Sequence, residues 1–193
     1  MNKFYPVLIP AMIILASCSP KKNKQNLDDI ILLNESQVTN FVNILPVIFK
    51  FSDKYYSGLS QEERDSTNYN LKFFEALEKD NSINKLLPEY NFSNSIELIK
   101  VYNNVVMEYT TITRDFGNYK KDLDNLRQTI DSEKTNYSIG LKDKSLSEDD
   151  RKVILSRLKD LADDEKRVSN IIIVRKYEKR IDDAYFNYYG KKK

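Results

Sequence analysis

The 193-residue chain is close to neutral, with 31 Lys and Arg against 29 Asp and Glu and a formal net charge of +2. Such a chain lacks the strongly positive field that nucleic-acid binding requires, so we expect no nucleic-acid partner. It has no histidine and a single cysteine, which excludes Ser-His-Asp and Cys-His catalysis, an internal disulfide and any metal site built from several cysteine or histidine ligands.

The remaining chemistry is sparse as well. Four scattered glycines form neither a dinucleotide-binding nor a phosphate-binding loop. The acidic clusters at residues 62–65 and 163–165 lie among other charges, which is typical of a solvated helix face. We therefore expect no enzyme activity, no cofactor and no bound metal. With 31% charged residues and few glycines or prolines, the composition is typical of an all-α protein.

The N-terminus has the order of an export signal. Lys3 is followed by an apolar run at residues 7–16, which is shorter than the roughly 20 residues that a transmembrane helix needs. The run ends in Leu15-Ala16-Ser17-Cys18. These four residues resemble the lipobox of bacterial lipoproteins, the motif of the type II signal peptide. The alternative is an ordinary signal peptide that happens to contain a cysteine.

The resemblance implies that residues 1–17 are removed and that Cys18 becomes a lipidated first residue. It makes the membrane a partner through the lipid on Cys18 and places the protein in the bacterial cell envelope. Ser19, which stands where an aspartate favours inner-membrane retention in enteric bacteria, favours the outer membrane. The sequence leaves open whether the protein faces the periplasm or the cell surface.

Residues 18–26 form a polar, basic stretch that we interpret as a flexible tether. As a coil, eight or so residues reach only about 15–17 Å, which keeps the following domain near the lipid headgroups. Lys21, Lys22 and Lys24 either contact anionic lipid or simply keep the linker soluble. Residues 27–193 then form one domain.

Residues 27–92 predict several shorter helices. Residues 27–56 have apolar side chains at helical spacing, with Pro46 expected to kink or break the helix and Gly58 expected to follow its end. Ser60 and Glu63 form a capping-box sequence before a helix that should bury three residues and end near Asn81. The three are Leu71, Phe74 and Leu77.

Residues 93–190 predict a long helical hairpin. A heptad-like seam runs from about residue 95 to residue 140, and Gly117 is its only weak point. The seam residues are Tyr102, Val106, Tyr109, Ile112, Phe116, Tyr119, Leu123, Leu126 and Ile130. After a charged turn, Ser147 starts a second helix that ends at Gly190. Two helices of about 60 Å joined by a short loop should pair antiparallel. The predicted fold is an elongated helical bundle built around this hairpin. Exposed heptad positions are compatible with a dimer interface, and the sequence leaves the oligomeric state open.

The chain contains 13 tyrosines and no tryptophan. Its densest aromatic group lies near the C-terminus, beside basic residues, and is either ordinary packing or a binding surface for a protein or envelope partner. The residues are Tyr185, Phe186, Tyr188, Tyr189, Arg175, Lys176, Lys179 and Arg180.

The chain ends in three lysines, which complement the dipole of the last helix or contact an anionic surface. Cys18 and Lys193 also match the pattern of the murein lipoproteins of enteric bacteria, and that resemblance implies a cell-wall link through Lys193. The hypothesis from sequence is a membrane-anchored helical lipoprotein with a binding or structural role. The alternatives are a periplasmic helical chaperone or stress protein, loosely resembling the Spy-like class, and a cell-wall tether.

Overall fold

A computed structural model describes residues 29–64, 69–114 and 119–190. The predicted signal peptide, Cys18, the tether and Lys193 therefore lie outside the described residues. Within those ranges all regular structure is helical, which confirms the all-α prediction. The α-helices are α2 (Glu35–Ser57), α3 (Gln61–Arg64), α4 (Tyr69–Lys79), α5 (Asn81–Leu86), α6 (Ser95–Arg114), α7 (Tyr119–Gly140) and α8 (Glu148–Tyr189), and a 3-10 helix η1 spans Leu87–Tyr90.

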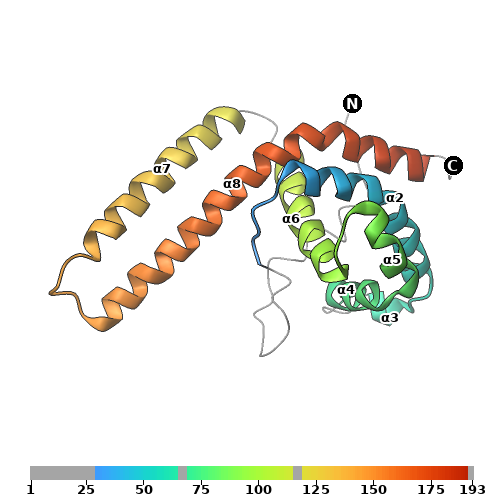
Figure 1. Cartoon of the computed structure of the whole chain (residues 1–193), viewed down its shortest axis with the longest axis horizontal. Coiled ribbons are helices and arrows are strands. Elements are labelled where there is room, and N and C mark those ends of the chain that lie inside the picture. The colour runs from blue at the N-terminus through green and yellow to red at the C-terminus, as the bar shows by residue number, and fades with distance from the viewer. Residues whose placement is uncertain (1–28, 65–68, 115–118, 191–193) are drawn as a thin grey trace.

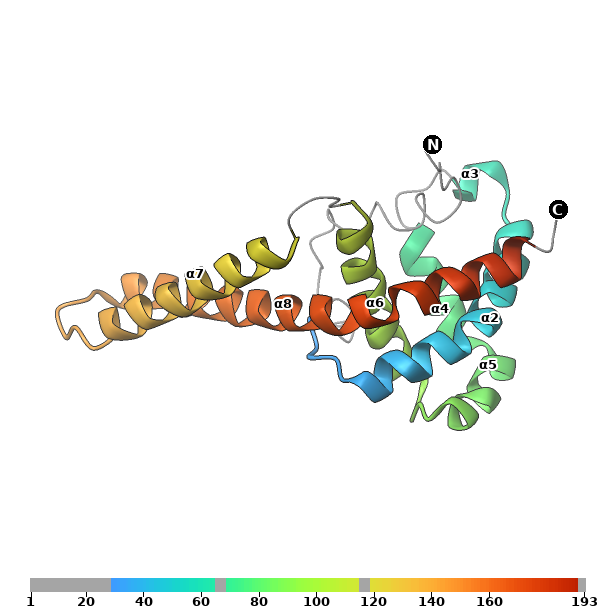
Figure 2. The ribbon, with the colours of Figure 1, turned by 90° about the horizontal axis from the view of Figure 1, so that it is seen from above.

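The molecule has two parts that share α8. The C-terminal half of α8 packs with α2, α4, α5 and α6 in a compact group of helices, which we call the bundle (Figure 1). The N-terminal half of α8 pairs antiparallel with α7 and projects away from the bundle, and we call this pair the arm (Figure 2). At about 1.5 Å per residue, the 42 residues of α8 extend for about 63 Å.

Helix α2 begins later than its apolar pattern predicts. Asn34 is its N-cap, and a capping box joins the Asn34 and Gln37 side chains to each other's backbone N–H groups. The predicted start near residue 27 is therefore wrong, because residues 29–33 run as a non-helical segment into the cap. Pro46 lies inside one helix rather than between two, and Gly58 is the C-cap as expected.

The short helices that follow cover one side of the bundle. The Ser60–Glu63 capping box is present, with the Ser60 N–H donating to the Glu63 carboxylate at 2.9 Å. Phe74 and Leu77 are buried as predicted, but Leu71 is 41% exposed, so the prediction that it is buried is wrong. The connector through η1 buries Ile83 and Leu87 against the same core.

The predicted single helix from residue 95 to residue 140 is instead two helices. Helix α6 ends at Arg114 and α7 begins at Tyr119, and the two run in different directions (Figure 1). The expected weak point, Gly117, falls in the short stretch outside the described residues. The physical reason is that the two halves of the seam have different partners. Ile112 belongs to the core of the bundle, whereas Ile130 packs with Leu161 of α8.

The two parts differ in how much apolar surface they bury. The bundle has one continuous core drawn from α2, α4, η1, α6 and the second half of α8, including Phe41, Leu77 and Val174. Within the described part of the arm, the buried apolar cluster consists of Ile130, Leu161 and Val168. Ion pairs join the rest of the arm, with Lys134 to Glu165 and Glu133 to Arg157 both at 2.8 Å.

Candidate functional site

The C-terminal half of α8 runs side by side with α2, in the same direction, and carries the predicted aromatic and basic surface (Figure 1). Tyr185, Tyr188 and Tyr189 share one helix face because they are spaced by three and four residues. All three rings contact Phe49 of α2, with centroid distances of 6.1, 5.5 and 5.4 Å respectively. These tyrosines therefore join α8 to α2 and are only partly accessible.

Two of the tyrosines also share a carboxylate of α2. The Tyr188 hydroxyl donates to Asp53 at 2.9 Å, and the Tyr189 hydroxyl donates to the other oxygen of Asp53 at 3.4 Å. Burial, followed by the Asp53 charge, raises the pKa of Tyr189 well above its usual range. Phe186 is 48% exposed, and its ring meets that of Tyr185 edge to face with the centroids 5.8 Å apart.

The basic residues of the predicted surface are exposed, and their contacts tie them to α2 and to α8 itself. Lys176 pairs with Glu35 of α2 at 2.5 Å, and Lys179 pairs with Asp183 on its own helix at 2.8 Å. Arg180 donates to Asn43 at 3.2 Å and stands 5.3 Å from the centre of the Tyr177 ring. Arg175 is exposed too. The structure thus places the four basic side chains on the outer face and three of the four aromatic rings against α2. Whether this surface binds a partner remains a prediction.

A second constellation, which the sequence pattern did not indicate, lies where α6 meets α8. Asn104 of α6 and Asn170 of α8 are 2% and 0% exposed, and both bind the segment that precedes α2. Asn104 accepts from the Ile31 N–H at 3.2 Å and donates to the Asp29 carbonyl at 3.1 Å. Asn170 accepts from the Leu33 N–H and donates to the Ile31 carbonyl, both at 2.8 Å.

These four bonds fasten residues 29–33 across two helices that are far away in the sequence. We call this segment the strap and the two asparagines the clamp. Asn104 also donates to the Lys100 carbonyl one turn earlier, which fixes the orientation of its amide. At the start of the strap, Lys100 pairs with the exposed carboxylate of Asp29 at 3.3 Å.

One helical turn beyond Asn104, α6 carries Glu108, whose side chain is fully buried. The Arg167 Nε of α8 donates to its Oε1 at 3.4 Å, and its Oε2 has no hydrogen-bond partner among the described residues. Burial raises the pKa of Glu108 to about 7, although the positive charge of Arg167 acts in the opposite direction. This carboxyl therefore sits beside the clamp, at the point where the arm leaves the bundle.

The sequence contained a signal for Glu108 alone. Glu108 interrupts the apolar stretch at residues 105–109, where a helix facing the core would carry an apolar side chain. A polar residue at such a position needs a partner, which here is Arg167 of α8. Asn104 follows Asn103 and Asn170 follows Ser169, so neither asparagine interrupts an apolar run.

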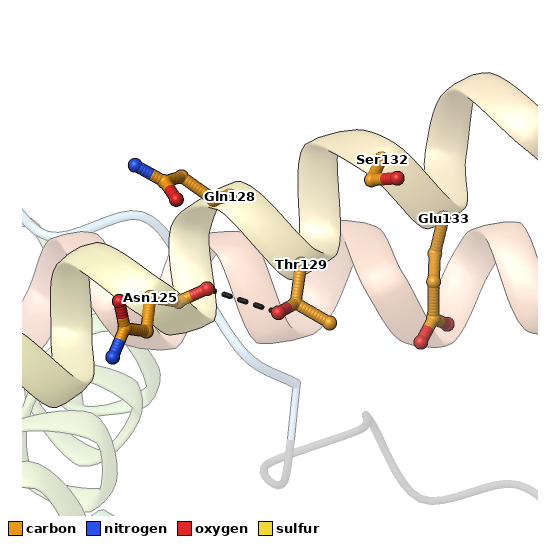
Figure 3. Close-up of a pocket in the computed structure, with 5 residues that line it drawn as sticks. All are labelled: Asn125, Gln128, Thr129, Ser132 and Glu133. Carbon is orange, nitrogen blue, oxygen red and sulfur yellow. Dashed lines mark hydrogen bonds between the residues drawn. The ribbon is translucent and has the colours of Figure 1, made fainter.

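The outer face of α7 has a shallow depression of about 450 Å³. Its described lining comes entirely from α7, and Figure 3 shows Asn125, Gln128, Thr129, Ser132 and Glu133. The Thr129 hydroxyl donates to the Asn125 carbonyl at 3.0 Å. Glu133 is committed to its ion pair with Arg157, so these five residues do not provide an acid–base pair.

The described ranges also lack a metal site and a membrane-spanning helix. They contain no group of three or more acidic or cysteine side chains placed to hold a metal ion. None of the helices there has an apolar stretch long enough to span a bilayer. Comparison with known proteins is also negative, since no family model, no curated protein and no solved structure matches this chain.

Proposed function

We propose that this protein is a lipid-anchored component of a bacterial cell envelope that acts by binding, without catalysis. The observation that carries the proposal is the sequence Leu15-Ala16-Ser17-Cys18 at the end of a short apolar run. Residues 18–26 then serve as the tether, and the strap begins a few residues later. In this proposal, Cys18 is the anchor, residues 18–26 are the linker and the folded domain follows them.

The strap supports this reading because it joins the tether to the folded domain. A force on the anchor would act first on residues 29–33. The hydrogen bonds of the clamp would transmit it to both α6 and α8. A single acyl chain binds a bilayer only marginally, whereas the several chains of a bacterial lipoprotein hold it firmly. The domain would then stay near the membrane and present the arm and the outer face of α8 to a partner.

Lipidation is tested by comparing the full chain with its Cys18→Ala variant in a bacterial host. Cells are fed an alkyne-bearing palmitate, and the protein is then isolated and separated between detergent and aqueous phases. The wild type should carry the label and enter the detergent phase, and the variant should do neither. An unlabelled wild type in the aqueous phase would contradict the proposal.

Exposure is tested by treating intact cells with protease and blotting for the domain, with lysed cells as the control. Loss of the domain from intact cells would place it on the outer surface. The exposed basic side chains Arg175, Lys176, Lys179 and Arg180 would then face the surroundings of the cell. Digestion only after lysis would place the domain in the periplasm.

The arm gives one specific reason to keep a chaperone role as the second candidate. Four of its large apolar side chains are exposed, at 44% to 68% of their surface, and three of them lie near its tip. They are Leu126, Ile139, Val153 and Leu155. A chaperone needs such exposed apolar surface to hold an unfolded client. The delipidated domain should then suppress client aggregation, and the triple change Ile139→Ser, Val153→Ser, Leu155→Ser should abolish that effect.

A further inference from the structure

The buried amides of the clamp are energetically unfavourable unless the strap is in place. A buried amide that loses its hydrogen bonds destabilises the fold, and Asn104 and Asn170 are both almost fully buried. Each uses both ends of its amide on the strap, accepting from an N–H group and donating to a carbonyl. The seam between α6 and α8 is therefore built to hold an extended backbone.

The pairing follows the geometry of a β-ladder. In extended backbone, the N–H and C=O groups of alternate residues point to the same edge. The clamp binds that single edge, through the carbonyl of Asp29, both polar groups of Ile31 and the N–H of Leu33. Each asparagine bonds a carbonyl and the N–H two residues later, as one residue of a parallel neighbouring strand would. Such contacts recognise backbone and are independent of side-chain identity.

The side chains of the strap add a simple selectivity. Leu33 is 2% exposed and Ile31 packs against the core, whereas Leu32 between them is 61% exposed. Peptide sites that add a strand work in this way, with backbone bonds for affinity and pockets for alternate side chains. The pattern that fits is an extended peptide with apolar residues two positions apart.

Helix α2 does not need the strap in order to begin. Helix α2 is closed by its own capping box of Asn34 and Gln37, which satisfies the backbone groups at its start. At the other end, apart from its bond to the clamp, the strap has an ion pair between the partly exposed Asp29 and Lys100, and such pairs contribute little. The strap can therefore leave the seam as a unit while α2 stays capped.

We propose that the α6–α8 seam is a backbone-reading peptide site, with the strap of the same chain as its resident ligand. A peptide with the strap's pattern, supplied in trans, competes for the clamp. This holds whether or not Cys18 is lipidated. If it is, displacement adds residues 29–33 to the tether and lengthens the link to the membrane.

The site is tested with a full chain whose strap cannot dock, carrying Ile31→Asp and Leu33→Asp. The probe is a fluorescent peptide of residues 27–35, and the readout is its anisotropy. The opened chain should bind the peptide at least tenfold more tightly than the wild type, whose site is filled. Adding Asn170→Leu to the opened chain should weaken binding at least tenfold. The matched control, Asn125→Leu on the exposed face of α7, should leave binding unchanged.

Equal binding by the wild-type and opened chains would overturn the proposal, as would binding that is indifferent to Asn170→Leu. Circular dichroism shows whether the opened chain keeps its helices. If it does not, hydrogen exchange in the unmodified chain decides. The Ile31 and Leu33 amides should be protected, and excess peptide 27–35 should speed their exchange at least threefold. Unprotected amides, or rates unaffected by the peptide, would overturn the proposal.

Discussion

The bundle and the arm share one continuous helix but hold it in different ways. In the bundle, α8 faces apolar side chains from several helices, and Val174 at its centre has no exposed surface. In the arm, the helix that α8 packs against among the described residues is α7, and the buried cluster described there is limited to three side chains. The comparison shows that continuity of a helix does not make its stability uniform, because most helical stability comes from tertiary packing.

Charge also contributes differently in the two regions. The ion pairs of the arm, such as Lys134–Glu165 and Arg157–Glu133, have side chains that are 34–52% exposed, and pairs screened by solvent in this way contribute little to stability. The bundle instead contains a buried carboxyl, Glu108, beside the root of the arm. We therefore expect the arm to open locally while the bundle remains folded.

The largest effect should come from the core of the bundle. Phe41 is 1% exposed and contacts Tyr102 of α6 edge to face. Phe41→Ala should lower the free energy of unfolding by about 3–5 kcal/mol, because it removes a large buried ring and leaves a cavity. Chemical denaturation followed by circular dichroism measures the change. A loss below about 1 kcal/mol would mean that the bundle is not the more tightly packed region.

The next effect concerns pH at the junction. Because folding raises the pKa of Glu108 from its usual value of 4.5 to about 7, the folded state binds this proton more tightly than the unfolded state. The contribution of Glu108 to stability is therefore most favourable at low pH and is lost as the pH rises towards 7. Glu108→Gln, which stays neutral, should be more stable than the wild type by roughly 3 kcal/mol at pH 8, since one pKa unit is about 1.36 kcal/mol.

The same comparison at pH 4.5 should show little difference between Glu108→Gln and the wild type. Thermal unfolding at both pH values provides the measurement. A variant that is less stable than the wild type at pH 8 would show that the pairing with Arg167 outweighs the cost of burying the charge.

A smaller and local effect is expected in the arm. Leu161 is 2% exposed and belongs to the three-residue cluster there. Leu161→Ala should lower the free energy of opening the arm by about 2–3 kcal/mol and leave the bundle almost unchanged. The rate of proteolytic cleavage within the arm measures arm opening. An antibody to the bundle reports whether the bundle remains folded. Equal destabilisation of both regions would show that they unfold together.

The smallest effect should come from charge screening. Removing one pair with Arg157→Gln should weaken the arm slightly at low salt, and 1 M salt should reduce that difference. The control is Lys179→Gln, whose pair with Asp183 lies on the bundle half of α8. That variant should leave arm opening unaffected. A salt-independent loss in Arg157→Gln would point to packing by its side chain instead.

Much of the local structure could be predicted from the sequence because its determinants are local. The caps at Ser60 and Ser147 depend on residues within one turn, and both form. The division between α6 and α7 could not be predicted from periodicity, because it depends on which neighbour each half of the seam meets. The packing of Tyr185, Tyr188 and Tyr189 against Phe49 likewise depends on the path of α2.

The clamp was unpredictable for the same reason. Asn104 and Asn170 lie in different helices, and their shared partner is a short segment near the other end of the chain. Helical periodicity also favoured extending α2 back through the strap, since Ile31 fits the apolar pattern. The strap is not helical because its polar groups bond to side chains of α6 and α8 rather than to a following helical turn.

The most direct test of the two-region account is residue-resolved hydrogen exchange of the full chain under native conditions. Amides of α7 and of α8 up to about residue 165 should exchange through local opening, at free energies well below that of global unfolding. Amides near Val174 and in α6 should exchange only when the whole protein unfolds. Uniform protection along α8, from the tip of the arm to the bundle, would contradict the account.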